Sequence, residues 1–397
     1  MHALDSTRAT DLITTVHATL PRPGELAIET VTGGRPLREF VGLARVIQGG
    51  DPHFVPPFED MQARQLRKAL GKDARLRLLL ARRGGEAVGR VAVIEDARHR
   101  RVRGEEVVFF GFFEAVEDVD VVKALIDAAS EVARDWDAEV LRGPRNLSRI
   151  SEIGALVEGH DCPPPMLAGH APAYYAELLE AAGMESHHDI LAWEVPLHKE
   201  DGSLRDVPAG MSRAIERART LDGLEVRPAS WWHILRDLKL AHHVFTEAFR
   251  DVPDNTPMPL SQWLSTGLVF LLLSSRRMLQ IATVHGKPAG FALCFVDLNE
   301  AQIHAGGRLF PFGWLRFLLS VRRIRTASFK LLGVVPEYRH SGLHMLMAYQ
   351  ACVGTYEAGY ARLEASLVDS RNHKMCKMLR RCDGEVYRRY RVFEKAL

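Results

Sequence analysis

The residues best suited to chemistry form one short stretch near the C-terminus, where an apolar strand runs into an anion-binding type of loop. Residues 331–343 read Leu-Leu-Gly-Val-Val-Pro-Glu-Tyr-Arg-His-Ser-Gly-Leu, and an apolar-periodic segment follows them. Backbone N–H groups at the start of a helix have no partner within it, and the helix dipole favours negative charge there. Gly342 lets the backbone approach a phosphate closely, and Arg339 can add a charge-assisted hydrogen bond. The stretch therefore predicts a phosphate site between a strand and a helix.

The string Val-x-Pro-Glu-Tyr-Arg-x-x-Gly within this stretch resembles the pyrophosphate-binding motif of the GCN5-related N-acetyltransferase (GNAT) superfamily, whose members transfer acyl groups from coenzyme A. The resemblance implies acyl-CoA as a co-substrate and no permanently bound cofactor. It also implies that a backbone N–H near Val334 or Val335 holds the thioester oxygen. The residues implied to bind the coenzyme are Arg339, His340, Ser341, Gly342, Leu343 and His344. His344 is a departure, because the superfamily usually has a small residue there.

Acyl transfer to an amine also needs a base that accepts the proton of the amine. The predicted catalytic residues are Glu364, Asp297, His304 and Asn372, with Glu300 as a further carboxylate. A structural salt bridge explains Glu364 equally well, and His304 falls in an expected polar strand that could lie at the surface.

Many superfamily members place a tyrosine on the last helix to protonate the leaving thiolate. Counting from Asn372, this position falls on Leu379. The acid is therefore absent or supplied by Tyr349, Tyr387 or Tyr390.

The composition is that of a soluble globular protein with a sizeable core. The chain has 397 residues, 47% of them apolar and 26% charged, which suits two domains, and its formal net charge is +2. Five cysteines without C-x-x-C spacing favour reduced thiols and a cytoplasmic location. We expect no signal peptide, no bilayer-spanning segment, no metal ion and no nucleic-acid partner.

One order of elements is written twice along the chain. It comprises a hairpin (76–95 and 278–297), a strand (107–113 and 327–335), a helix (121–136 and 343–358), a second strand (140–146 and 361–372), a second helix (174–183 and 373–384) and a last strand (190–195 and 389–394). This predicts an α/β protein of two tandem acetyltransferase-like domains, each a mixed, mainly antiparallel central sheet flanked by helices and splayed at one point. The predicted divisions are a tail (1–25), a degenerate domain (26–200), a linker (201–224) and an acyl-CoA-binding domain (225–397).

The two predicted domains differ in chemistry. The N-terminal one lacks Arg-x-x-Gly, and four acids, Glu114, Glu117, Asp118 and Asp120, stand where a pyrophosphate would bind. Their charges would repel it. We therefore expect no coenzyme site there, and a contribution to the acceptor pocket instead.

Two apolar segments, 264–273 and 309–321, could line a tunnel for a long chain. A helix beginning after Gly313 would place Arg316, Ser320 and Arg323 on one face. It is either a core helix with a solvated edge or a basic amphipathic helix that touches a membrane through Arg316, Arg322, Arg323 and Arg325.

Strings along nearly the whole chain narrow the resemblance. Asp-Pro-His-Phe-Val-Pro-Pro, Gly-Pro-Arg-Asn-Leu-Ser, Leu-Val-Glu-Gly-His and Gly-Arg-Leu-Phe-Pro-Phe-Gly are similar to a bacterial group of double acetyltransferase-fold proteins that includes the bacterial ceramide synthases. The resemblance implies transfer of a long acyl chain to a sphingoid base such as 3-ketosphinganine, with transient contact at the inner face of the cell membrane. Where this group is expected to have an acid just before the asparagine, the chain has Asp369-Ser370-Arg371-Asn372.

Two other functions remain open from the residues. One is an N-acetyltransferase or N-acyl amino acid synthase with a small acceptor and an acyl carrier protein as a further donor. The other is a non-catalytic acyl-CoA-binding module. The intact loop from Arg339 to Gly342 disfavours the module, and the two apolar segments favour a lipid amine over a small one.

Overall fold

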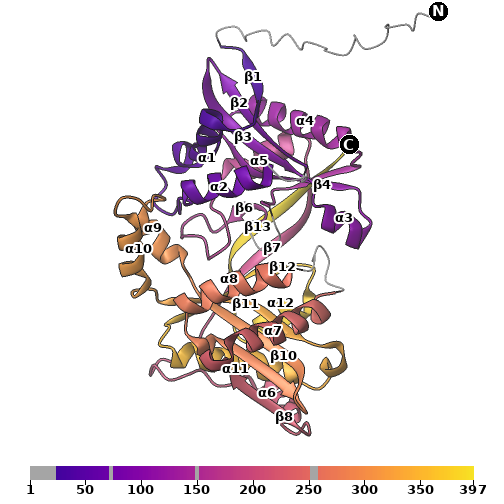
Figure 1. Cartoon of the computed structure of the whole chain (residues 1–397), viewed down its shortest axis with the longest axis vertical. Coiled ribbons are helices and arrows are strands. Elements are labelled where there is room, and N and C mark those ends of the chain that lie inside the picture. The colour runs from indigo at the N-terminus through magenta and orange to yellow at the C-terminus, as the bar shows by residue number, and fades with distance from the viewer. Residues whose placement is uncertain (1–23, 71–74, 148–151, 251–257) are drawn as a thin grey trace, which may run out of the picture.

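A single 13-stranded sheet runs through the molecule, in the order β1-β2-β3-β4-β5-β13-β7-β12-β11-β10-β9-β8, with β6 paired to β13 (Figure 1). The computed structural model describes residues 24–70, 75–147, 152–250 and 258–397. The strands are β1 (Leu26–Val31), β2 (Leu76–Arg83), β3 (Glu86–Ile94), β4 (Val107–Ala115), β5 (Val140–Gly143), β6 (Ala155–Glu158), β7 (Glu185–Val195), β8 (Leu224–Pro228), β9 (Leu279–Val284), β10 (Lys287–Val296), β11 (Thr326–Val334), β12 (Arg362–Asp369) and β13 (Glu385–Ala396). We call β1–β7 the N-terminal half and β8–β13 the C-terminal half.

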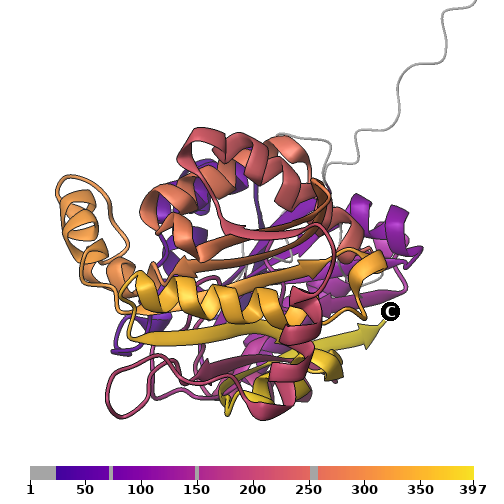
Figure 2. The ribbon, with the colours of Figure 1, turned by 90° about the horizontal axis from the view of Figure 1, so that it is seen from below.

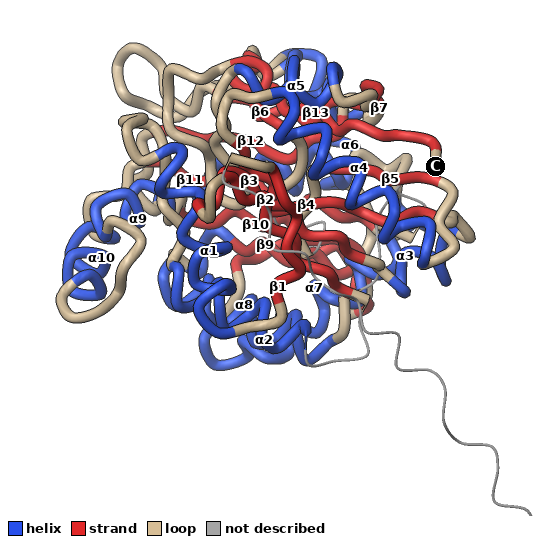
Figure 3. The backbone as a smooth tube through the Cα atoms, turned by 90° about the horizontal axis from the view of Figure 1, so that it is seen from above, coloured by secondary structure: helices blue, strands red, loops and turns tan. Residues whose placement is uncertain are grey.

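Helices cover both faces of this sheet (Figure 3). They are α1 (Gly34–Gln48), α2 (Glu59–Leu70), α3 (Ala97–Arg103), α4 (Val119–Asp135), α5 (Tyr174–Ala181), α6 (Ala209–Arg219), α7 (Ile234–Ala248), α8 (Leu260–Leu273), α9 (Asn299–Ala305), α10 (Gly313–Val321), α11 (Leu343–Glu357) and α12 (His373–Arg381). In the N-terminal half, α4 and α5 pack in one core cluster and α1 and α2 in another. In the C-terminal half, α6, α11 and α12 share one cluster, while α7 and α8 share another. The expected α/β fold with flanking helices is confirmed.

The expected splay occurs at one pair of strands in each half. All strand pairs are antiparallel except β4 with β5 and β11 with β12. The parallel pairing of β11 with β12 covers only Thr326–Phe329 and Arg362–Ala365. Beyond Phe329, β11 continues to Val334 without β12 beside it. In this fold the splay leaves backbone groups and side chains of both strands facing one another across a wedge.

The two halves exchange their last strands, which the sequence did not predict. Strand β13 lies between β5 and β7, and β7 lies between β13 and β12. In Figure 1 the yellow strand β13 accordingly runs up among elements of the N-terminal half. Trp193 on β7 and Tyr390 and Phe393 on β13 are buried, so the exchanged strands also bring core side chains with them. The sheet therefore cannot be divided into two independent sheets, and the domain limits predicted above stay predictions.

Three segments differ from, or go beyond, the sequence analysis. Residues 299–305, expected as part of a polar strand, form α9, which ends at Gly306 in the left-handed conformation (φ 61°). The proposed linker contains α6, which packs on α11. Of the predicted tail, residues 1–23 lie outside the described residues.

Candidate functional site

The predicted phosphate loop connects β11 to α11. Gly342 is the N-cap of α11, with φ 88°, a left-handed value that L side chains rarely adopt. A Cβ atom on Gly342 would lie 2.0 Å from the carbonyl oxygen of Ala214 in α6. The backbone that closely approaches this glycine is therefore that of α6, whereas the sequence suggested a phosphate on that side.

Donors for an anion are nevertheless present in the loop. The backbone N–H groups of His340, Gly342 and His344 take part in none of the backbone hydrogen bonds among the described residues. Ser341 Oγ accepts from the N–H of Leu343 at 3.2 Å, which orients the first turn of the helix. Arg339 is exposed at the loop surface. Three backbone donors thus lie at the start of α11, while Arg339 Nη2 donates to the carbonyl of Ala248 at the end of α7 at 3.3 Å.

The corresponding place in the N-terminal half is already occupied by a carboxylate of the chain itself. Asp118 caps α4, and its Oδ1 accepts from the N–H groups of Asp120 (2.9 Å) and Val121 (3.4 Å). Its Oδ2 accepts from Arg83 Nη1 at 2.7 Å, and this hydrogen bond is the main reason why the pKa of Asp118 lies below its usual value. Because Asp118 fills the helix N-terminus, the prediction of no coenzyme site in this half has a physical basis.

A buried charged cluster bridges the splay between β11 and β12. Lys330 is the extra residue of a β-bulge, because Phe329 pairs with Cys294 and Leu331 pairs with Leu293. Its Nζ donates to Glu364 Oε1 (3.2 Å), to Ser366 Oγ and to the carbonyl oxygen of Met166 (2.7 Å). The side chains of Lys330 and Glu364 are only 6% and 4% exposed. The sequence analysis missed Lys330, although a lone lysine inside an apolar strand was the available signal.

Two of the predicted catalytic carboxylates belong to this cluster. Burial raises the pKa of Glu364, and this outweighs the opposing effect of Lys330 and Ser366. Burial, reinforced by the charge of Glu364, raises the pKa of Asp297 to about 7, against the opposing charge of Lys330. Glu364 Oε2 is buried and has no hydrogen-bond partner among the described residues. The cluster can therefore exchange a proton near neutral pH.

Backbone geometry selects one of the two predicted N–H donors for a thioester oxygen. The N–H of Val335 donates to the carbonyl of Ala289 at 3.0 Å, so this group is already used. Val334 lies opposite Gly290 in the same register. Hydrogen-bonded and non-hydrogen-bonded pairs alternate along an antiparallel ladder, so the N–H of Val334 points to the other edge, toward the splay.

A loop from the N-terminal half lies over the splay of the C-terminal half. We call residues 159–173, between β6 and α5, the cover loop. Asn299 Nδ2 donates to the carbonyls of Pro164 (3.0 Å) and Pro165 (3.1 Å), and Lys330 holds the carbonyl of Met166. The expected contribution of the N-terminal half to the acceptor pocket stays a prediction.

A second buried network fixes the other end of the cover loop. Arg388 Nη2 on β13 donates to His170 Nδ1 at 2.9 Å, so the proton of His170 is on Nε2, which donates to Asp51 Oδ2 at 2.8 Å. Burial lowers the pKa of His170, with the positive Arg388 acting in the same direction. Arg388 also donates to the carbonyl of Cys162. The network joins the 51–57 turn, the cover loop and an exchanged strand.

The remaining predicted residues are placed elsewhere. His304 is exposed on α9, and no described contact joins it to Glu364 or Asp297. Asn372 is exposed and caps α12, with its Oδ1 accepting from the N–H of Met375 at 3.1 Å. Leu379 is buried in the core, where no acid can act. Among the tyrosine candidates, burial raises the pKa of both Tyr387 and Tyr390, and the charge of Glu364 acts in the same direction on both, so this effect does not choose between them.

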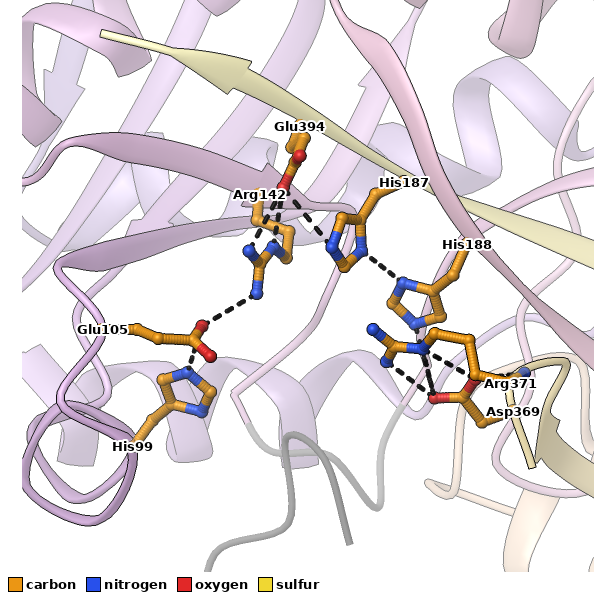
Figure 4. Close-up of polar contacts among 8 residues, drawn as sticks. All are labelled: His99, Glu105, Arg142, His187, His188, Asp369, Arg371 and Glu394. Atoms are coloured by element: carbon orange, nitrogen blue, oxygen red, sulfur yellow. Dashed lines mark hydrogen bonds and ion pairs between the residues drawn. The ribbon is translucent and has the colours of Figure 1, made fainter.

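The acid near Asn372 belongs to a polar network across the exchanged strands (Figure 4). Arg371 donates to both oxygens of Asp369, and His188 Nε2 lies 3.8 Å from Asp369 Oδ2. Burial alone would raise the pKa of Asp369, but the hydrogen bonds from Arg371 outweigh it and lower the pKa. His188 Nδ1 lies 2.5 Å from His187 Nδ1, and His187 leads on to Glu394 at 3.6 Å. Asp369 thus joins the halves, and its lowered pKa favours the ionised form.

Two absences apply to the described residues only. None of the helices in the described ranges is both long and apolar enough to cross a membrane. Within the same ranges, no group of three or more His, Cys, Asp or Glu side chains is arranged to hold a metal ion.

Comparison with solved structures identifies the fold. A tandem GNAT protein from the clavulanic acid biosynthesis pathway superposes with a TM-score of 0.52 at 15% identity, covering 94% of this chain and 98% of that one. A GCN5-related N-acetyltransferase from Sphaerobacter thermophilus gives a TM-score of 0.51 at 16% identity, covering 95% and 97%. The chain therefore has the tandem GNAT fold, as its sequence predicted.

Curated proteins of similar length extend this comparison. The chain is 27% identical to Protein YghO of Escherichia coli (strain K12) over 379 residues, which is 93% of this chain and 95% of the relative. It is also 27% identical to a protein named Bacterial ceramide synthase of Caulobacter vibrioides over 383 residues, 94% of this chain and 98% of the relative. A scan against models of protein families found no match. Both relatives therefore match along nearly the whole length of the chain.

Proposed function

We propose that the protein is an N-acyltransferase that moves a long-chain acyl group from acyl-CoA to the primary amine of a sphingoid base, such as 3-ketosphinganine. The product is a ceramide-type amide. The observation that carries the proposal is the buried Lys330–Glu364–Asp297 cluster, which lies in the splay of the half that has the coenzyme loop. The similarity to a protein named Bacterial ceramide synthase over 94% of the chain supports the acceptor class.

In the proposed reaction the buried cluster accepts the proton of the amine, and the edge of β11 binds the carbonyl oxygen of the thioester. The acceptor amine must lose a proton before its lone pair can attack the thioester carbonyl carbon, and Asp297, with a pKa of about 7, is suited to accept it. As the C–N bond forms, the N–H of Val334 hydrogen-bonds the carbonyl oxygen, which gains negative charge. The C–S bond then breaks, and the coenzyme thiolate takes a proton, with Tyr349, Tyr387 and Tyr390 as the candidate donors.

The acyl donor is proposed to bind through the loop from Arg339 to His344, with its pyrophosphate near the backbone N–H groups of His340, Gly342 and His344. Acyl-CoA is then a co-substrate and leaves after each turnover. A sphingoid base is an amphiphile, so we propose a cytoplasmic protein that works at the inner face of the cell membrane.

The decisive experiment incubates purified protein with palmitoyl-CoA and 3-ketosphinganine, and identifies the amide by mass spectrometry. Acetyl-CoA, a palmitoylated acyl carrier protein and small amines serve as competing substrates. Amide formation with the long-chain pair, lost in the stable variant Asp297→Asn, supports the proposal. Preference for acetyl-CoA and a small amine would favour the alternative acetyltransferase, and acyl-CoA binding without any product would favour a binding module.

A further inference from the structure

The connection between β10 and β11 carries the largest group of exposed apolar side chains in the described part of the chain. We call residues 298–325 the arm; it contains α9 and α10 and stands away from the rest of the molecule in Figure 2. Six large apolar side chains of its outer part are exposed: Phe310 (72%), Phe312 (68%), Trp314 (45%), Leu315 (43%), Leu318 (47%) and Leu319 (57%). None of the residues of α10 is buried, so its interpretation as a core helix is wrong. A contiguous exposed patch of this kind marks an interaction surface.

Apart from Glu300 at the base of the arm, whose Oε2 accepts from the N–H of Arg325 at 3.0 Å, the charged side chains around this patch are all arginines. The exposed arginines of the arm are Arg308, Arg316, Arg322, Arg323 and Arg325. The sequence from Ala301 to Arg325 contains neither aspartate nor glutamate. Aromatic and leucine side chains bordered only by arginines are typical of segments that lie in the interface of an anionic lipid layer. A protein partner or a second copy would need acidic groups against the same arginines, and the patch itself offers none.

Contacts at the base of the arm and at Phe317 on α10 hold the arm against the N-terminal half; we call the exposed apolar side chains of residues 310–319 its tip. Arg45 Nη1 donates to the carbonyl of Gly306 at 2.8 Å, and Gln302 Nε2 donates to the carbonyl of Pro56 at 3.0 Å. The rings of Phe58 and Phe317 pack edge to face, 5.6 Å apart. These contacts fix the direction of the arm, so its tip can enter a lipid layer without disturbing the sheet.

The same arm begins and ends at the candidate site. It follows Asp297 directly and leads back into Thr326 at the start of β11. Asn299, its second residue, donates hydrogen bonds from Nδ2 to the carbonyl groups of Pro164 and Pro165 of the cover loop. The arm therefore connects its exposed tip to the splay and to the edge of the cover loop. A lipid layer in contact with the tip would be joined to the candidate site through the arm.

We propose that the arm inserts its apolar tip into the surface of an anionic bilayer and that the lipid amine passes from this bilayer along the arm to the splay. The inference rests on the proposed function only for the acceptor; the docking itself does not depend on it. Apolar insertion and arginine attraction contribute separately, so salt should weaken docking without abolishing it.

Two sets of substitutions separate these contributions. The tip variant is Phe312→Ser/Leu315→Ser/Leu319→Ser, and the basic variant is Arg316→Gln/Arg322→Gln/Arg323→Gln. The matched control is Val46→Ser/Met61→Ser, because these apolar side chains on α1 and α2 are also exposed (77% and 56%) but lie outside the arm. Unchanged circular dichroism and unchanged acyl-CoA binding in all variants exclude misfolding as an explanation.

Flotation with vesicles tests the docking. Wild type and control should float with phosphatidylcholine–phosphatidylglycerol vesicles, and high salt should reduce this binding several-fold. The tip variant should bind vesicles at least tenfold more weakly than wild type at either salt concentration. The basic variant should bind charged and neutral vesicles equally weakly. Flotation of the tip variant like wild type would overturn the proposal, as would a wild type that does not float. A wild-type dimer that the tip variant converts to a monomer, with no vesicle binding, would assign the patch to a second copy and also overturn it.

Turnover tests the delivery step separately from the reaction. With 3-ketosphinganine in vesicles, the tip variant should show a KM at least tenfold higher and a nearly unchanged kcat. With a short-chain, freely soluble homologue of the amine, tip variant and wild type should be equal. Equal losses with both amines would overturn the delivery step. Absence of turnover in wild type would refute the proposed acceptor while leaving the flotation result to decide the docking.

Discussion

Substitution of the Lys330–Glu364 pair would show whether it serves the reaction or only the fold. Both side chains are more than nine-tenths buried, and their atoms Nζ and Oε1 are 3.2 Å apart. Removing one partner of such a pair leaves an uncompensated buried group, which costs about 3–5 kcal/mol of the free energy of unfolding. Replacing both partners by apolar side chains of similar size is often neutral or stabilising. We therefore expect Glu364→Gln and Lys330→Met to be unstable, and Lys330→Met/Glu364→Leu to regain most of the lost stability.

Activity should follow a different order. If Glu364 and its charged neighbours handle the proton of the amine, the double variant remains inactive although it is stable, with kcat lower by roughly 10²–10⁴-fold, the usual contribution of general acid–base catalysis. Urea unfolding gives the free energies, and amide formation from palmitoyl-CoA, measured below the unfolding temperature of each variant, gives kcat.

The matched control is the ion pair of Arg362 and Glu194, which joins β12 to its other neighbour β7 and is about half exposed, at 57% and 44%. Its removal by Arg362→Met/Glu194→Leu should change stability by about 1 kcal/mol or less and leave kcat unchanged. A Lys330→Met/Glu364→Leu protein that keeps the kcat of wild type would refute the catalytic assignment and make the buried pair a structural one.

Three other predictions concern the same site and the coenzyme loop. Burial raises the pKa of folded Asp297 to about 7, so the unfolded protein binds fewer protons between pH 4 and 7 and the free energy of unfolding falls as pH rises through this range. Asp297→Asn should therefore be more stable than wild type by roughly 4 kcal/mol at pH 8, and this difference should vanish near pH 4. A pH-independent difference in stability would show that burial does not act on this carboxyl. Arg339→Ala should weaken acyl-CoA binding by up to about 3 kcal/mol in calorimetry without changing stability, whereas undiminished binding would remove this residue from the coenzyme site. If the site binds a long chain, each buried methylene adds about 0.8 kcal/mol, so kcat/KM should rise from acetyl- to palmitoyl-CoA, and a flat series would exclude a tunnel.

Much of the fold could be predicted because its signals are local. The Gly84-Gly85 and His285-Gly286 turns, with positive φ in each, close the two hairpins where the sequence indicated. Residues 299–305 were wrongly assigned because a short helix with polar and apolar residues mixed shows no clear period; Gly306, a left-handed C-cap, was the available signal. The strand exchange has no local signal at all. The sequences of β7 and β13 are compatible with pairing in either half of the sheet. Long-range pairing with neighbouring strands decides which half each strand joins.

The site was only partly predictable for a similar reason. Glu364 and Asp297 could be named because carboxylates next to apolar strand residues are unusual. His304 was included for its residue type, but only the structure reveals that it faces solvent. Asn372 could have been interpreted as a helix N-cap from its place before residues 373–381. Lys330 reaches the splay because it is the extra residue of a β-bulge. A bulge is defined by the pairing with the neighbouring strand β10, so it could not be predicted from the sequence of β11 alone.

The N-terminal half is retained for what it gives to the other half. Its own helix N-terminus is filled by Asp118, so coenzyme binding does not explain it. Its β7 pairs with β12, the strand that carries Glu364 and Ser366, and its cover loop holds Lys330 and Asn299 through three carbonyl groups. In return, β13 places Arg388 on His170 of the cover loop. Each wall of the splay thus depends on a segment from the other half, and neither half would build the site without its partner.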